Sequence, residues 1–268
     1  MNKAKNIVQY IVLTIFSLFS VFPLYWMAIS ATNASVDVSR GTLMLGNELV
    51  NNFTKLLTNQ NLVGAMINSF KYSILLTVLS LFVCSLAGYG FEIYHDKKKD
   101  VVMNIILLAM MVPFAATMIP LFQMFSKAKL LNSTIGFLLP TISTPFLIML
   151  FRQSARSFPH DIIEAARIDG LNEFSIFYKM FFPTMRSTYA AAMTITFMNA
   201  WNSYLWPKVI MTNNKSITMP MLVANLREGY ITDYGVLMLA VLLCSIPTVI
   251  VFFVLQKSFA EGITGAVK

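Results

Sequence analysis

Glu164, Arg167 and Asp169 form a short charged stretch, followed at once by Gly170, between two long apolar runs. Carboxylate and guanidinium groups of this kind make charge-assisted hydrogen bonds to groups of opposite charge. Neither a nucleophile with a base nor a set of metal ligands accompanies them, so catalysis is not indicated. Recognition of another polypeptide is the chemistry that these residues favour.

The residues around this stretch predict two short helices joined by a turn. Pro159 suits the start of the first helix, and either Ser157 or Asp161 is a candidate cap for it. Asp161 and Glu164 also have the spacing of a capping box. Gly170 supplies the permissive backbone that a sharp reversal needs.

A second short helix is predicted over residues 173–182. Asn172 is a candidate for its N-terminal cap, and Pro183 is expected to interrupt it. Four phenylalanines lie between these two residues at near-helical spacing, namely Phe174, Phe177, Phe181 and Phe182. Residues 157–183 are therefore expected to form a helix-turn-helix loop.

The composition places this loop beside a lipid bilayer. Hydrophobic residues make up 57% of the 268 residues and charged residues only 12%, whereas charged residues approach about a quarter of a soluble domain. A transmembrane helix needs roughly 20 apolar residues. Runs of that length without Asp, Glu, Lys, Arg or His cover residues 8–31, 72–91, 101–126, 130–151, 187–206 and 235–256. We therefore expect an all-α membrane protein in which residues 1–268 form one domain with six transmembrane helices.

Basic residues indicate the orientation, because lysine and arginine in short loops resist translocation. With the six expected spans, 12 of the 20 basic residues fall on the side that holds both termini and the 157–183 loop. Lys97, Lys98 and Lys99 directly flank a span on that side. Both termini and the loop are thus predicted to be cytoplasmic. The net charge of +8 follows from this topology, and a nucleic-acid partner is not expected because no basic residues interleave with exposed aromatics.

Other chemistry-bearing residues are isolated. Cys84 and Cys244 fall inside expected spans, and His95 and His160 lie next to spans without partners in the sequence, so no metal site or disulfide framework is predicted. No charged residue lies within the spans, which weakens ion-coupled transport without excluding it, since sodium can bind carbonyls and hydroxyls. The chain also lacks a G-x-x-x-x-G-K-[ST] phosphate loop. Energy from ATP would have to arrive through another polypeptide, and the 157–183 loop is the expected contact.

The stretch Glu164-Ala-Ala-Arg-Ile-Asp-Gly170 and the phenylalanines behind it resemble the EAA loop of ATP-binding-cassette importer permeases. Further along, Trp201-Asn-Ser-Tyr-Leu-Trp-Pro207 resembles the W-N-x-[FY]-L-W-P segment of the carbohydrate branch, and residues 262–268 resemble its tail. The likeness covers nearly the whole chain and is closest to the shorter, six-span permease of maltose-type importers. Two positions depart from the family pattern: Leu171 stands where a small residue is usual, and residues 186–188 lack a second proline.

The resemblance implies the type I importer fold and a set of partners. In such importers two permease chains enclose the pathway, two cytoplasmic ATPases each hold one EAA loop, and an extracellular binding protein delivers the solute. ATP and Mg²⁺ bind to the ATPases, so the permease itself is expected to hold no cofactor. The chain would then be a lipid-embedded, multi-pass subunit in the plasma membrane of a bacterium or archaeon, and not an enzyme.

The resemblance also implies two contacts with the ATPases. At the first, Glu164 is expected to meet a basic group of the ATPase, while Asp169 remains open between direct contact and a helix cap. The full set expected at this contact is Glu164, Ala165, Ala166, Asp169, Gly170 and Phe174. The second contact is the tail, where composition alone favours a frayed end, but the resemblance places Gly265, Ala266, Val267 and Lys268 at the seam between the ATPases.

A polar stripe on the fifth expected span is the candidate translocation path. Thr196, Asn199 and Asn202 recur at i, i+3 and i+6 and suit a neutral hydroxylated solute, although such residues also serve only to hydrogen-bond neighbouring helices. Nearby, Trp201, Tyr204 and Trp206 root an outer segment that by resemblance contacts the binding protein, or they form a membrane-interface belt.

The sequence thus predicts the permease subunit of an ATP-driven importer of a sugar or oligosaccharide. Two alternatives remain: a permease of the same importer class for a non-sugar solute, and a self-sufficient carrier or channel.

Overall fold

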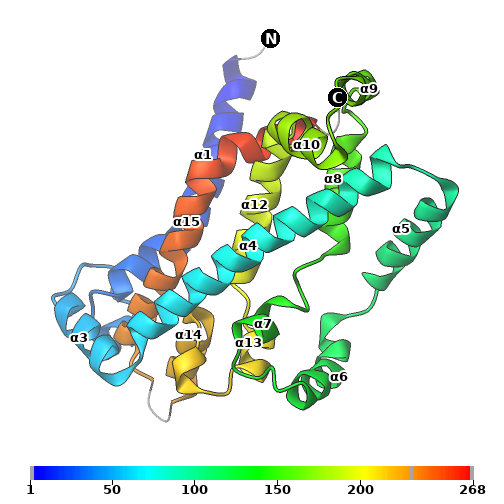
Figure 1. Cartoon of the computed structure of the whole chain (residues 1–268). Coiled ribbons are helices and arrows are strands. Elements are labelled where there is room, and N and C mark those ends of the chain that lie inside the picture. The colour runs from blue at the N-terminus through cyan, green and yellow to red at the C-terminus, as the bar shows by residue number, and fades with distance from the viewer. Residues whose placement is uncertain (1–2, 230–231, 266–268) are drawn as a thin grey trace. The chain divides into compact units, whose positions relative to one another are not determined.

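The computed structural model describes residues 3–229 and 232–265, with side chains for residues 6–229 and 232–256. Every regular element in these residues is a helix (Figure 1). The helices divide into two compact units. Unit 1 comprises Met1–Val63 and Met221–Pro247, and unit 2 comprises Gly64–Pro220 and Thr248–Lys268.

Unit 1 is held together by buried asparagines. It contains α1 (Lys3–Ser30), α2 (Ser35–Ser39), α3 (Leu49–Asn59), most of α14 (Met219–Glu228) and the first part of α15 (Tyr234–Gly265). The Asn52 amide donates to the carbonyls of Ala31 and Asn33, both at 3.0 Å, and the Asn33 amide donates to Met44 at 2.9 Å. These bonds satisfy backbone groups that follow α1 and fix α3 beside its end.

Unit 2 contains both regions that the sequence singles out. Its helices are α4 (Leu62–Ile93), α5 (Lys97–Ala109), α6 (Phe114–Lys127), α7 (Thr134–Leu138), α8 (Pro145–Ala155), α9 (His160–Ile168), α10 (Glu173–Ile176), the π-helix η1 (Phe177–Phe181), α11 (Phe182–Thr184), α12 (Arg186–Trp201), α13 (Leu205–Ile210) and the short 3-10 helix η2 (Asn214–Ser216), together with the part of α15 that follows Pro247. Its core gathers side chains of α4, α8, α9, η1 and α12, with Phe151 and Phe181 fully buried. The hydroxyls of Ser154 and Thr188, 2.9 Å apart, join α8 to α12.

Fewer helices than the six expected spans are long and apolar enough to cross a membrane. Among the described residues these are Asn6–Ser30, Leu62–Ile93 and Tyr234–Gln256. A fourth arises if α5 and α6 form one broken span, which bends by 96° between Ala109 and Phe114. Pro113 explains the bend, because it lacks an N–H and disfavours helical backbone in the residue before it. The number of spans stays a prediction.

The expected span 130–151 is interrupted. α7 begins where the Ser133 hydroxyl accepts from the Gly136 amide at 3.0 Å, and it ends at Leu138. α8 does not start until Pro145, which occupies the first helical position. The expected span 187–206 is likewise divided between α12 and α13. Irregular backbone at membrane depth is tolerated where it is buried in protein or lines a cavity, so these gaps point to a pocket.

Candidate functional site

The 157–183 loop folds as two short helical segments around a sharp turn. Behind α9, the Gly170 amide donates to the carbonyl of Arg167 and the Leu171 amide donates to that of Ala166, both at 3.0 Å. This pair of bonds is a Schellman motif, which needs left-handed backbone at its glycine. Gly170 has a φ of +80°, as the sequence predicts.

Helix capping in the loop follows the sequence prediction at one end only. Asn172 caps α10 by accepting from the Ser175 amide at 2.8 Å, which confirms its predicted role. For α9, both candidate caps were wrong, because the N-cap is Pro159 and no side chain caps the helix. The Ser157 hydroxyl instead donates to the carbonyl of Ser154 at 2.7 Å.

The second helical segment continues past the predicted stop at Pro183. A π-turn over Phe177–Phe181 follows α10, and the Phe182 amide donates to the carbonyl of Phe177, five residues back. Pro183 lies at the beginning of α11, where its missing N–H is tolerated. The break falls instead at Met185, whose φ of −90° and ψ of 23° depart from helical values.

The loop has an inner face and an outer face. Ile163, Ala166, Ile176, Phe177 and Phe181 are buried in the core of unit 2. The outer face carries Glu164, Ala165 and Asp169, together with two large apolar side chains, Ile168 at 86% and Phe174 at 61% exposure. Ala166 thus packs against its own chain, and of the two alanines only Ala165 is exposed. Sequence reasoning missed Ile168, although its place outside the buried stripe of α9 could have identified it.

Charges on the loop fall into a paired group and an unpaired group. The Arg167 Nε donates to Glu173 Oε1 at 2.7 Å, and the Arg167 guanidinium lies 5.8 Å from the centre of the Tyr94 ring. The hydrogen bond from Arg167 lowers the pKa of Glu173 below its usual range. Among the described side chains, neither Glu164 nor Asp169 has an ion-pair partner. Asp169 also occupies the C-cap position of α9, with its amide donating to Ala165 at 2.9 Å.

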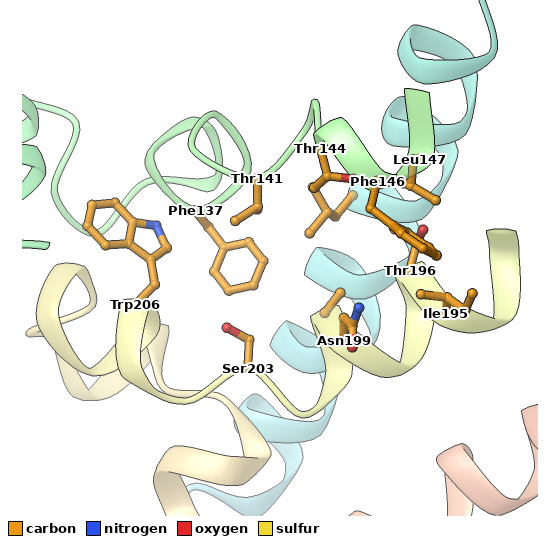
Figure 2. A pocket seen from close by; sticks show the side chains of 12 residues that line it. Phe137, Thr141, Thr144, Phe146, Leu147, Ile195, Thr196, Asn199, Ser203 and Trp206 are labelled. Carbon is orange, nitrogen blue, oxygen red and sulfur yellow. The ribbon is translucent and has the colours of Figure 1, made fainter. Parts of the chain in front are cut away.

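A pocket of about 340 Å³ lies at the two gaps just described, the one between α7 and α8 and the one between α12 and α13 (Figure 2). Figure 2 shows Asn199 and Ser203 on one side of it and Phe137 and Thr141 on the other. Hydroxyl, amide and aromatic groups line this space, and the lining includes no charged side chain. The polar members are Thr141, Thr144, Thr196, Asn199 and Ser203, and the aromatic members are Phe137, Phe146 and Trp206.

The structure brings together two of the three predicted path residues in this pocket. Thr196 lines it, but its hydroxyl donates to the carbonyl of Ala192 at 2.7 Å. Asn199 is exposed there, with no hydrogen bond to another described residue. Asn202 lies outside this pocket, where it lines a neighbouring cavity and donates to the carbonyl of Met198 at 2.9 Å at the end of α12.

Thr141, Thr144 and Ser203 are pocket residues that the sequence analysis missed. The first two lie in the gap between α7 and α8, and the third lies in the gap after α12. Pro140 and Pro145 flank Thr141 and Thr144 in the sequence. These prolines signal a break in the helix, which a count of apolar residues does not detect.

The two tryptophans of the 201–207 segment pack inside the protein. Trp201 is 1% and Trp206 3% exposed. The Trp206 Nε1 donates to the carbonyl of Gly136 at 3.1 Å, and the Trp201 ring meets Phe70 edge-on at 4.7 Å. The interpretation of these two residues as a membrane-interface belt was therefore wrong, because belt residues lie at the lipid surface.

Comparison with known proteins identifies the family. The model of the family described as "Binding-protein-dependent transport system inner membrane component" matches residues 94–265, which include the 157–183 loop and the pocket segments 137–147 and 195–206. The chain belongs to this family. It is a transport permease subunit and not an enzyme.

Relatives of this permease are similar over nearly their whole length. The lactose transport system permease protein LacG of Rhizobium radiobacter is 42% identical, with 100% of this chain and 98% of LacG covered. The arabinooligosaccharides transport system permease protein AraQ of Halalkalibacterium halodurans is 33% identical over 93% of this chain and 91% of AraQ. A chain from the crystal structure of a bacterial ABC transporter involved in the import of the acidic polysaccharide alginate has the same fold, with a TM-score of 0.83, 22% identity and coverage of 97% and 99%.

The predicted tail contact falls mostly beyond the described structure. α15 continues to Gly265, its last residue. Ala266, Val267 and Lys268 lie outside the described residues.

Proposed function

We propose that this permease forms part of the membrane pathway of an ATP-driven importer for a neutral sugar or short oligosaccharide. The observation that carries the proposal is the pocket beside Asn199, which offers hydroxyl, amide and aromatic groups without a charged side chain. Sugars present hydroxyl groups and apolar ring faces, so this lining is complementary to them. The names of LacG and AraQ, which refer to lactose and arabinooligosaccharides, support the same class of substrate.

An anionic solute is the second candidate. The sn-glycerol-3-phosphate transport system permease protein UgpE of Yersinia pestis is 30% identical over 100% of this chain. A phosphate or carboxylate leaving water needs a cation or several hydrogen-bond donors. The pocket lining contains no Lys or Arg, which favours the neutral solute. A self-sufficient carrier or channel is disfavoured, because the family is described as dependent on binding proteins.

The proposed assembly has a second permease chain, two cytoplasmic ATPases that bind ATP and Mg²⁺, and an extracellular binding protein. In this arrangement the permease crosses the plasma membrane several times, with six spans and with both termini and the 157–183 loop in the cytoplasm. Lys97, Lys98 and Lys99 at the start of α5 support this orientation.

The outer face of the loop is the proposed ATPase contact. Glu164 and Asp169 are exposed without an ion-pair partner among the described residues, so they are available to basic groups of the ATPase. Ile168 supplies exposed apolar surface on the same helix, and Phe174 supplies more on α10. The small side chain of Ala165 allows another chain to approach the exposed face of α9 closely, and Gly170 makes the turn that follows this helix. By resemblance to maltose-type importers, Gly265 to Lys268 form the second contact.

Co-purification tests the assembly. The tagged permease, expressed with the genes that neighbour its own, is expected to retain a second permease and an ATPase through detergent extraction and size-exclusion chromatography. A permease that is recovered folded but alone, under conditions in which both partners are produced, would contradict the proposal. ATP hydrolysis by the recovered complex, with its binding protein and a panel of neutral sugars and sugar phosphates, then distinguishes the two classes of solute.

A further inference from the structure

An ionic cluster built around a buried arginine lies at the base of the 157–183 loop, outside both proposed sites. The Arg152 side chain on α8 is only 6% exposed. Its Nε donates to Glu92 Oε2 at 3.1 Å, and its Nη2 donates to Asp100 Oδ1 at 2.6 Å. Because Glu92 lies at the end of α4 and Asp100 in the first turn of α5, one guanidinium joins three helices.

The cluster sits where the helices are in backbone contact. At Gly88 of α4, an added Cβ would lie 2.6 Å from the Cβ of Phe151 and 2.7 Å from the amide nitrogen of Arg152. The Glu92 side chain is 15% exposed and also accepts from Arg156 at 3.4 Å. A buried guanidinium is tolerated only with such partners. Because α4 and α8 are in close contact at Gly88, the backbone of Arg152 is held near the end of α4 that carries Glu92.

A second arginine attaches the far side of the loop to the same place. Arg167, at the end of α9, lies over the ring of Tyr94 and pairs with Glu173 at the start of α10. Arg152 on α8 reaches Glu92 in the last turn of α4, and Arg167 in the last turn of α9 reaches Tyr94, which directly follows α4. The helices before and at the exposed loop face thus both contact the same end of α4.

Two of the helices that these contacts join, α4 and α8, also line the pocket. α4 contributes Leu76 to the pocket wall, and α8 contributes Phe146 and Leu147. We infer that Arg152 and Arg167 are positioning residues that clamp the loop to the end of α4, so that displacement of the loop moves α4 and α8 together at the pocket. This inference rests on the proposed function for its readout of transport, because it concerns how ATPase motion reaches the solute.

The test compares Arg152→Met with Arg186→Met in the full complex. Arg186 is an exposed arginine in the first turn of α12, outside the cluster, and serves as the matched control. For Arg152→Met we expect the number of ATP molecules hydrolysed per sugar transported to rise above the values of the wild type and of Arg186→Met, with the complex still assembled. Arg152→Lys, which keeps a positive charge between Glu92 and Asp100, is expected to retain part of the coupling.

A distance measurement tests the clamp without transport. Spin labels at Asp161→Cys on α9 and Lys98→Cys on α5, with Cys84 and Cys244 replaced by alanine, are expected to give a narrow distance distribution that broadens in Arg152→Met and not in Arg186→Met. If Arg152→Met cannot be recovered folded, Arg167→Met, whose native side chain is 42% exposed, takes its place. Unchanged coupling together with an unchanged distribution would overturn the inference. A wild-type chain that neither retains an ATPase nor transports sugar would contradict the proposed function, while its distance distribution still decides whether the clamp exists.

Discussion

The backbone amide of Leu171 donates to the carbonyl of Ala166 at 3.0 Å and closes the turn that follows α9. In a Schellman motif the residue after the glycine commonly makes an apolar contact with the last turn of the helix. Leu171 packs against the core that contains Ala166 and Ile163. A large residue at this position, unusual for the family pattern, thus anchors the turn rather than loosening it.

Replacing Gly170 with alanine tests this turn. An added Cβ would meet nothing within 4 Å, so the cost comes only from the φ of +80°, about 1–2 kcal/mol. Gly90 in α4 is the control, because an added Cβ there also meets open space while the backbone is helical. We expect a lower thermal midpoint in detergent for Gly170→Ala and no decrease for Gly90→Ala. Equal midpoints in the two variants would show that the turn does not depend on left-handed backbone.

Glu164→Ala tests the outer face of α9. A charge-assisted contact at an interface contributes enough that its loss should weaken ATPase binding by about tenfold. Asp37→Ala, which removes a carboxylate on α2 outside the loop, should leave binding nearly unchanged. Titration of the purified ATPase onto permease in nanodiscs measures both. Equal affinities for both variants and the wild type would remove Glu164 from the contact.

Asn199→Leu tests the pocket. The change replaces an amide with an apolar side chain, and we expect reduced sugar-stimulated ATP hydrolysis with normal assembly. Thr194→Val on the same helix is the control, because the Thr194 hydroxyl bonds to its own helix and is not among the pocket residues. If the sugar stimulates ATP hydrolysis by Asn199→Leu as strongly as by the wild type, the polar stripe serves only in helix packing.

The Arg167–Glu173 pair predicts acid sensitivity of the loop. The pKa of Glu173 is lower in the folded chain than in the unfolded chain, because Arg167 donates to its carboxylate. The pair therefore stabilises the loop fully above the unfolded pKa of Glu173, and this stabilisation is lost as pH falls through the folded pKa. The effect is small, because the Glu173 side chain is 44% exposed and screened by solvent. A spin label at Ile168→Cys should become more mobile as pH falls below about 4. Glu173→Gln should already show raised mobility at pH 6 and lose this pH dependence.

Local signals in the sequence predicted the loop better than the pocket. Gly170 and Asn172 act on backbone groups within three residues, so their roles follow from spacing alone. The pocket hydroxyls of Thr141 and Ser203 come together only after chain segments about sixty residues apart have packed, and a run of apolar residues does not show where its helix stops. The same limit applies to Ala166, because the direction of its side chain depends on which face of α9 meets the core.

ATP-dependent uptake into proteoliposomes tests the central claim most directly. The complex of this permease with its partner permease and ATPase is reconstituted with ATP inside the cytoplasm-equivalent compartment, and radiolabelled solutes are offered with the binding protein on the opposite side. We predict uptake of a neutral sugar or oligosaccharide that requires ATP and is not inhibited by sn-glycerol 3-phosphate. ATP-dependent uptake of the phosphate ester with none of any neutral sugar, or sugar uptake that continues without ATP, would contradict the account.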